Sequence, residues 1–203
     1  MPAYPSIAVF CGSSDTIPAA YTQPAFELGG LLARRGIRLV FGAGKTGLMG
    51  AAADGVLQAG GEVVGVVNES LNLPHLIHAG LTRLEVVADM TIRKARMLEL
   101  AQAVIALPGG FGTWDELFEV LALVQIGQAA HPVGLLNTRG YYDPLLAQVA
   151  LARQEGFVYA EHTGLIVAHS EPEGLLRALE AYQPPAGLER WVTREEKRAR
   201  LDA

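Results

Sequence analysis

Short apolar runs alternate along the chain with longer segments in which apolar residues recur at helical spacing. Runs bounded by glycine or proline are typical of buried strands, and the longer segments are typical of amphipathic helices. The pattern predicts seven strands, at residues 7–11, 37–41, 62–67, 83–87, 103–107, 133–136 and 165–167. It predicts six helices, at residues 18–35, 48–59, 91–101, 114–127, 142–155 and 172–182.

Most of the predicted strands are followed by a helix. This alternation predicts an α/β fold with one doubly wound, mainly parallel sheet and helices on both faces. We expect a single domain over residues 1–185, followed by a charge-rich helix or tail over residues 186–203. Ligands of such sheets bind beyond the carboxyl ends of the strands, so the loops after the strands are the candidate sites.

Composition excludes several classes of protein. Half of the 203 residues are hydrophobic and 18% are charged, which excludes a disordered chain. No apolar run is long enough to cross a bilayer, and no basic region precedes the first apolar stretch. A formal net charge of −5 gives no general attraction to nucleic acid or anionic membranes. We therefore expect a soluble cytoplasmic protein with neither as a partner.

Cysteine and histidine usage narrows the chemistry further. The single cysteine, Cys11, excludes an intrachain disulfide and a multi-cysteine metal site, and the five histidines show no metal-ligand spacing. Cys11 ends a predicted strand and is interpreted as a buried small residue, with a reactive thiol as the alternative.

The loop at residues 42–47 reads G-x-G-x-x-G between a strand and a helix. This is the dinucleotide-binding fingerprint, but it follows the second strand, and the acidic residue Glu69 lies two residues beyond the next apolar run. A phosphate-binding P-loop would need a glycine where Leu39 stands. Two interpretations remain: an anion site that includes Gly44, or a tight turn without a ligand.

The loop at residues 108–113 holds three glycines in four residues and leads into a helix. Glycines destabilise a loop because they lose more conformational freedom on folding than other residues. They are therefore expected where a side chain would block a contact that the backbone makes. A phosphate on the N–H groups of Gly110, Gly112 and Thr113 would be such a contact. The alternative role of Glu116 is a capping box with Thr113 as the N-cap.

The helix predicted from residue 91 begins with three basic residues, Arg93, Lys94 and Arg96. Positive charge is unfavourable at a helix N-terminus, so these side chains need an anionic ligand or carboxylate partners. The simpler interpretation is a solvated basic face.

These motifs together resemble the LOG ("Lonely Guy") family. Residues 108–116 match its P-G-G-x-G-T-x-x-E signature, and Met90, Arg93, Lys94 and Met97 match its M-H-x-R-K-x-x-M element. Residues 42–50 match most of its G-G-G-x-x-G-L-M-G loop, and residues 11–14 and 140–146 also fit. The resemblance covers about residues 6–182.

The resemblance implies a Rossmann-like fold, a homodimer, no cofactor and no metal. It implies hydrolysis of the N-glycosidic bond of a nucleoside 5′-monophosphate to an adenine-type base and ribose 5-phosphate. The catalytic residues would be Arg93 and Glu116. The substrate-binding residues would be Lys94, Gly109, Gly110, Phe111, Gly112, Thr113, Gly44, Ser13 and Met90. The sequence departs from the family at Ala43, in place of a glycine, and at Thr91, in place of a histidine.

Breaking the bond to the base builds positive charge on the ribose. We expect the Glu116 carboxylate to stabilise that charge, with Arg93 as its partner. A guanidinium neighbour should lower the pKa of Glu116, and Glu119 is a weaker candidate for a supporting role.

The segment 117–126 is apolar around nearly the whole helix. We expect part of it to form a subunit interface, with burial inside the monomer as the alternative. Tyr141 and Tyr142 are interpreted as packing residues at a helix start.

Two other functions remain open at this point. One is a non-catalytic Rossmann-like protein that binds a nucleotide or a cofactor such as molybdenum cofactor. The other is an NAD(P)-dependent oxidoreductase, suggested by the loop at residues 42–47. Retention of both Arg93 and Glu116 favours the hydrolase.

Overall fold

The computed structural model describes residues 2–188, so most of the tail predicted at 186–203 lies outside the described residues. The strands are β1 Ser6–Phe10, β2 Arg38–Phe41, β3 Val63–Asn68, β4 Arg83–Val87, β5 Ala103–Ala106, β6 Val133–Leu136 and β7 Ile166–His169. The helices are α1 Ala19–Arg34, α2 Gly47–Gln58, α3 Met90–Glu99, α4 Phe111–Gln125, α5 Asp143–Gln154 and α6 Pro172–Glu180. Three short 3₁₀ helices join them, η1 Glu69–Leu71, η2 Thr138–Gly140 and η3 Ala160–Leu165.

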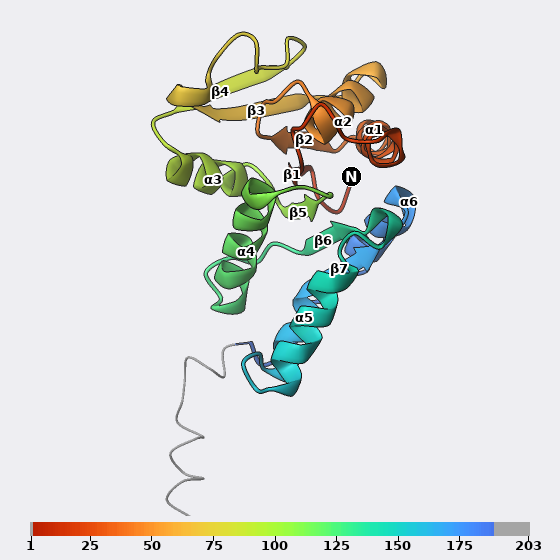
Figure 1. Cartoon of the computed structure of the whole chain (residues 1–203), viewed down its shortest axis with the longest axis vertical. Coiled ribbons are helices and arrows are strands. Elements are labelled where there is room, and N and C mark those ends of the chain that lie inside the picture. Colours follow the sequence, from red (N-terminus) through yellow and green to blue (C-terminus); the bar gives the residue numbers. More distant parts are fainter. Residues whose placement is uncertain (1, 189–203) are drawn as a thin grey trace, which may run out of the picture.

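The strands form one parallel sheet in the order β4-β3-β2-β1-β5-β6-β7 (Figure 1). β1 is central, and its Ile7 pairs with Leu39 of β2 on one side and Ala103 of β5 on the other. The chain winds outward from β1 to β4 and then returns to β5, so the winding direction reverses between β1 and β5. The carboxyl edge at such a reversal is where doubly wound sheets leave a crevice for ligands.

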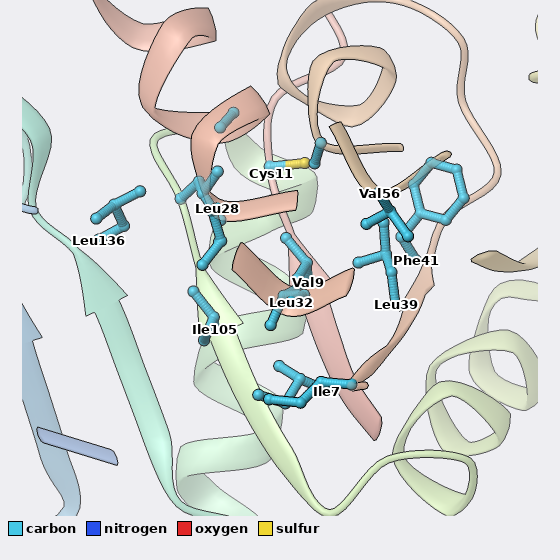
Figure 2. Packing of buried hydrophobic residues seen from close by; sticks show 14 of the residues in the cluster. Ile7, Val9, Cys11, Leu28, Leu32, Leu39, Phe41, Val56, Ile105 and Leu136 are labelled. Carbon is cyan, nitrogen blue, oxygen red and sulfur yellow. The ribbon is translucent and has the colours of Figure 1, made fainter. Parts of the chain in front are cut away.

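Helices cover both faces of the sheet because side chains alternate along its central strands. In β1, Ile7 and Val9 join the core under α1, α2 and α6, whereas Ala8 and Phe10 join the core under α3 and α4. Figure 2 shows the first of these cores, where Leu28 of α1 meets the side chains of β1 and β5. Burial on both faces explains why the strands read as continuous apolar runs.

The predicted α/β architecture is confirmed, with all seven strands and six helices at the expected places. β4 and β6 have the predicted bounds. The largest change near the candidate site is at α4, which begins at Phe111 rather than at Trp114. None of the helices between residues 2 and 188 is long and apolar enough to cross a membrane, and the cytoplasmic location stays a prediction.

Candidate active site

A cavity of about 630 Å³ lies at the carboxyl edge of the sheet, between the loops that follow β1 and β5. Its size is within the range of small-molecule sites. The N-terminal parts of four helices contribute to its wall, through Pro18 of α1, Leu48 of α2, Arg93 of α3 and Gly112 of α4. Because helix N-termini carry partial positive charge and free N–H groups, the cavity favours an anionic ligand.

Most of the predicted site residues meet in this cavity. The predicted residues that line it are Ser13, Met90, Arg93, Gly109, Gly110, Gly112, Thr113 and Glu116. Three others, Gly44, Lys94 and Phe111, are absent from its lining. The structure therefore unites residues from the loops after β1 and β5 with residues of α3 and α4. It does not bring Gly44, Lys94 or Phe111 into the same lining.

Arg93 is fixed on the wall of the cavity although only 4% of its surface is exposed. Its helix begins at the N-cap Asp89, whose carboxylate accepts a hydrogen bond from the N–H of Ile92. The Nε atom of Arg93 donates to the carbonyl of Val66 in β3 at 2.9 Å. Its Nη1 donates to Oε1 of Glu116 at 2.9 Å. The guanidinium is therefore held between a strand and a second helix.

Glu116 is the buried partner of Arg93, which confirms the predicted pairing. The predicted capping box is wrong, because Gly110 is the N-cap of α4 and Thr113 lies inside the first turn. Glu116 is thus the sixth residue of the helix, one turn too far along to reach the N-cap. Its carboxylate points to Arg93 instead.

The pKa of Glu116 is raised above its ordinary value, not lowered as predicted. Burial disfavours the charged carboxylate, and the ion pair with Arg93 offsets only part of that effect. The sequence indicated that Arg93 is the partner of Glu116, but it did not show how deeply Glu116 is buried. That burial decides the direction in which the pKa of Glu116 shifts.

The other basic residues of α3 have carboxylate partners away from the cavity. Lys94 donates to Asp115 Oδ2 at 2.9 Å and pairs with Glu119. These contacts join α3 to α4 and hold both Lys94 and Glu119 outside the cavity lining. The prediction of a solvated basic face is wrong for Arg93 and Lys94.

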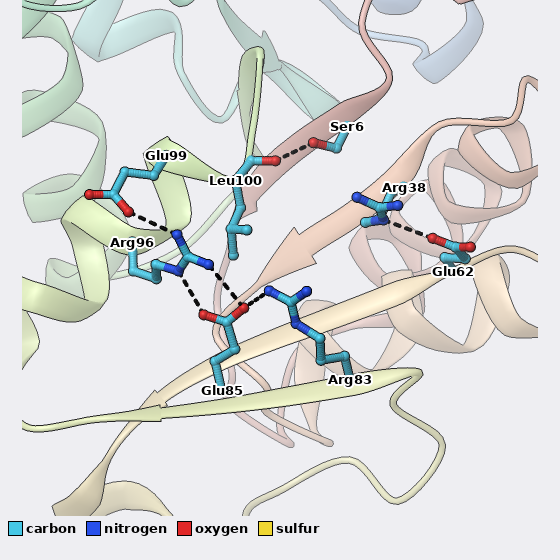
Figure 3. A network of polar contacts seen from close by, with 8 residues as sticks. All are labelled: Ser6, Arg38, Glu62, Arg83, Glu85, Arg96, Glu99 and Leu100. Carbon is cyan, nitrogen blue, oxygen red and sulfur yellow. Dashed lines mark hydrogen bonds and ion pairs between the residues drawn. The ribbon is translucent and has the colours of Figure 1, made fainter.

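Arg96 completes the same pattern on the outer side of α3. It pairs with Glu85 of β4 at 2.7 Å and with Glu99 at 2.9 Å (Figure 3). Arg83 also pairs with Glu85. This network ties α3 to the edge strand, so it supports the helix that carries Arg93.

The glycines at residues 42–47 make room for neighbouring groups. A Cβ atom at Gly42 would lie 1.9 Å from Nη2 of Arg93, and one at Gly44 would lie 2.8 Å from Sδ of Met49. Gly47 has a φ of 63°, and a Cβ there would lie 2.8 Å from the carbonyl oxygen of Gly12. The loop is also covered, because Gly44 forms an isolated bridge with Ile77. It is packed, and it presents no dinucleotide site.

The two departures from the family pattern lie outside the cavity lining. Ala43 is fully buried with a φ of 65°, a conformation that glycine adopts more easily. Thr91 is exposed on the first turn of α3. Neither residue is among those that line the cavity.

The loop at residues 108–113 is packed at Gly109, where a Cβ would lie 2.1 Å from Oγ1 of Thr113, but it is open at its other two glycines. Cβ atoms placed at Gly110 and Gly112 would meet no heavy atom within 4 Å. Both glycines line the cavity, at the start of α4. Their backbones are therefore accessible to a ligand, as an anion site at a helix N-terminus requires.

Sequence reasoning missed most of the apolar and aromatic wall. The missed lining residues include Ile17, Tyr21, Leu48, Met49, Leu71 and Tyr141. Tyr141 follows β6, next to β5, so its position at the carboxyl edge was the available signal. Leu71 carries no such signal, since it reaches the cavity only because the segment after β3 folds back.

Cys11 forms part of the cavity floor and is buried, as predicted. Burial raises the pKa of its thiol, and the nearby Glu116 carboxylate acts in the same direction. Because thiolates are the reactive form, this environment favours the inert interpretation over the reactive one.

Comparison with known proteins identifies the family. A family model described as "Possible lysine decarboxylase" matches residues 49–179. The probable cytokinin riboside 5′-monophosphate phosphoribohydrolase LOGL1 of Oryza sativa subsp. japonica is 44% identical over 176 residues, which are 87% of this chain and 79% of that protein. The chain belongs to the LOG family. The cytokinin riboside 5′-monophosphate phosphoribohydrolase of Rhodococcoides fascians is 43% identical, over 86% of this chain and 88% of that protein.

A solved structure shares the fold of this LOG-family chain. The molybdenum cofactor binding protein from Rippkaea orientalis superposes with a TM-score of 0.66 at 25% identity, over 87% of this chain and 96% of that one. The family model is described as a decarboxylase, and decarboxylases that use pyridoxal phosphate hold it through a Schiff base to a lysine. No lysine is among the described residues that line the cavity, so the cavity gives that description no support.

Proposed function

We propose that this LOG-family protein hydrolyses the N-glycosidic bond of adenine-type nucleoside 5′-monophosphates, either a cytokinin riboside monophosphate or AMP. The products are the free base and ribose 5-phosphate. One observation carries the proposal: the buried pair Arg93–Glu116 shares a cavity with the open backbone of Gly110 and Gly112. The named activity of relatives at 43–44% identity supports it.

The arrangement suits the charges that develop in the reaction. The 5′-phosphate binds at the N-terminus of α4, where N–H groups and the helix dipole favour an anion. The ribose then lies within reach of Glu116, which is about one turn further along the same helix. As the bond to the base breaks, positive charge grows on the sugar, and an ionised carboxylate stabilises it or orients the attacking water.

Arg93 supplies the matching positive charge. Its ion pair offsets part of the burial that disfavours the ionised carboxylate of Glu116. The bonds to Val66 and Glu116 hold both groups at fixed positions. A charge fixed before the reaction begins costs no reorganisation in the transition state. Lys94, Gly44 and Phe111 lie outside the cavity lining, so we give them no part in this mechanism.

Two matched pairs of variants test these roles. We expect Glu116→Gln and Arg93→Ala to lower kcat/KM for base release by about 10³-fold or more, the scale of losing a charge stabiliser. The controls are Glu62→Gln and Arg38→Ala, which break an exposed ion pair whose two residues lie outside the cavity lining. Near-normal turnover in either site variant would contradict the role of that residue.

The substrate assay uses the unmodified protein and a panel of nucleoside monophosphates and nucleosides. We expect free base from adenine-type monophosphates and none from nucleosides without a phosphate. Binding of nucleotide without release of base would instead favour a carrier or a cofactor-binding protein. Tight binding of NAD without release of base would favour the oxidoreductase.

We also propose that the protein is a homodimer joined through the outer face of α4. Leu117, Val120 and Val124 pack into the monomer, so the alternative of burial inside the monomer accounts for one side of the helix. The opposite side carries Phe111 and Phe118, which are 86% and 51% exposed. Two exposed phenylalanines on one helix favour an interface.

Sedimentation tests the dimer. We expect a dimer at micromolar concentration and a monomer in the Phe118→Glu variant, because a carboxylate in an apolar interface is costly. Phe157→Glu is the control, since Phe157 is even more exposed, at 84%, but lies after α5. A monomeric parent protein would contradict this proposal.

A further inference from the structure

We propose that Tyr141 is a positioning residue that aims the first N–H group of the phosphate site. The proposal rests on the function proposed above and adds a residue that does no chemistry itself. Its hydroxyl donates a hydrogen bond to the carbonyl oxygen of Gly109 at 2.5 Å.

Three consecutive carbonyl groups before α4 are held by donors from distant parts of the chain. Tyr142 donates its hydroxyl to the carbonyl of Leu107 at 2.6 Å. The N–H of Gly12 donates to the carbonyl of Pro108 at 3.0 Å. Tyr141 holds the third, that of Gly109. Each of these bonds fixes one peptide plane at the entrance to α4.

Tyr141 holds the peptide plane between Gly109 and Gly110, which carries an N–H group of the proposed phosphate site. A trans peptide is flat, so the carbonyl of Gly109 and the N–H of Gly110 belong to one rigid unit and point in opposite directions. A hydrogen bond to the carbonyl therefore sets the direction of the N–H. Because both neighbours are glycines, side chains do not restrict rotation of this peptide.

A rigid turn places the tyrosine. Between β6 and α5, Arg139 and Gly140 have φ values of 56° and 70°. The side chain of Asn137 accepts from the N–H of Tyr142 at 2.7 Å and donates to Asp143 at 2.7 Å. A non-glycine residue at positive φ is strained and persists where surrounding bonds impose it.

The ring of Tyr141 also has fixed neighbours. It meets the rings of Tyr21 and Tyr142 edge to face, with centroids 6.2 and 5.2 Å away. Tyr141→Phe keeps these ring contacts and removes only the hydroxyl, so it isolates the hydrogen bond to Gly109.

The test compares Tyr141→Phe with Tyr4→Phe. Tyr4 also donates its hydroxyl to a backbone carbonyl, that of Leu179 at 3.0 Å, and is absent from the cavity lining. Calorimetry measures the dissociation constants of ribose 5-phosphate and of adenine for the parent protein and both variants. We expect Tyr141→Phe to raise the dissociation constant of ribose 5-phosphate about tenfold, the scale of one hydrogen bond to a charged group. The dissociation constant of adenine should not change.

Kinetics add a second readout: KM for the nucleoside monophosphate should rise about tenfold in Tyr141→Phe, with kcat changed less than twofold. The proposal is overturned if Tyr141→Phe matches Tyr4→Phe, if adenine weakens equally, or if the parent protein does not bind ribose 5-phosphate. The binding assay does not require turnover. A parent protein that binds ribose 5-phosphate but releases no base would therefore contradict the proposed hydrolysis and leave this test intact.

Discussion

Two glycine-rich loops flank the centre of the sheet, and the glycines at residues 42, 44 and 47 differ in their surroundings from Gly110 and Gly112. In the loop at residues 42–47, a Cβ atom at any of the three glycines would come too close to a neighbouring atom. At Gly42, that atom is Nη2 of Arg93. In the loop at residues 108–113, Gly110 and Gly112 face open space. Both loops join a strand to a helix N-terminus, yet only the second offers its backbone to a ligand.

The difference shows that a glycine motif has two distinct physical causes. One is the removal of a side chain so that a neighbouring group fits, as Gly42 does for Arg93. The other is access of a ligand to N–H groups, as at Gly110. The first loop therefore packs against the Arg93–Glu116 pair, whereas the second is the loop that we propose binds the phosphate directly. Substitutions that add one methyl group separate the two causes.

Among substitutions in the two loops, the largest effect is expected from Gly42→Ala. The new methyl would overlap Nη2 of Arg93, so the guanidinium must shift from the position in which it bonds to Val66 and Glu116. We expect kcat/KM to fall by about 100-fold, the scale of a displacement of about 1 Å in an active site. The control is Gly30→Ala in α1, where the nearest atom is the end of the flexible Arg34 side chain. Unchanged activity in Gly42→Ala would remove the proposed link between this loop and the pair.

The pH profile tests the pair that the packed loop supports. Because the ionised carboxylate is the active form and burial raises the pKa of Glu116 above 4.5, kcat/KM should fall about tenfold per unit on an acid limb that lies above pH 4.5.

The effect of the same group on stability has the opposite sign. The folded protein binds this proton at a higher pH than the unfolded chain, so the free energy of unfolding decreases as pH rises through that window. Loss of activity on the acid side is thus not caused by unfolding through Glu116. Thermal melts at each pH check this, and an acid limb at or below pH 4.5 would contradict the assignment.

A smaller effect is expected from Gly112→Ala in the open loop. The methyl meets no protein atom, and alanine favours a helix over glycine by up to about 1 kcal/mol, so Tm should rise. The same methyl stands where the ligand would approach, so KM for the nucleoside monophosphate should rise about tenfold. A variant with higher Tm and unchanged KM would show that no ligand uses this backbone.

The smallest effect is expected from Ala43→Gly. Relief of the positive φ of Ala43 stabilises the folded state, whereas the added freedom of glycine stabilises the unfolded state. These contributions oppose each other, so we expect the free energy of unfolding to change by less than about 1 kcal/mol, with kcat/KM unaltered. Chemical denaturation measures the free energy of unfolding. A large loss of activity would contradict the prediction, because it would show that Ala43 affects the site.

Local patterns predicted the fold well because the central strands, such as β1, β3 and β5, are buried along their whole length and therefore read as apolar runs. The pairing of Arg93 with Glu116 was also predictable, since both lie near the starts of helices that cover the same face of the sheet. The capping box failed because α4 begins three residues earlier than predicted. The direction of the pKa shift of Glu116 failed because it depends on burial by residues from other elements.

Gly44 also shows that a local motif does not reveal contacts with distant segments. It stands in a motif that resembles a ligand loop, yet the chain after β3 returns to cover it, as its bridge with Ile77 shows. Tyr141 shows the converse, because a residue interpreted as packing lies in the cavity wall and holds Gly109. Both outcomes depend on segments more than 30 residues away in the sequence.

By itself, the sequence determined the alternation of strands and helices, the two loops and the charged residues that could meet at the carboxyl edge. These follow from periodicity and local backbone preference, which are properties of neighbouring residues. Only the tertiary structure decided which loop is packed and which is open, and how deeply the ion pair is buried. The space around a glycine and the water around a carboxylate are set by atoms from distant parts of the chain, which no local pattern contains.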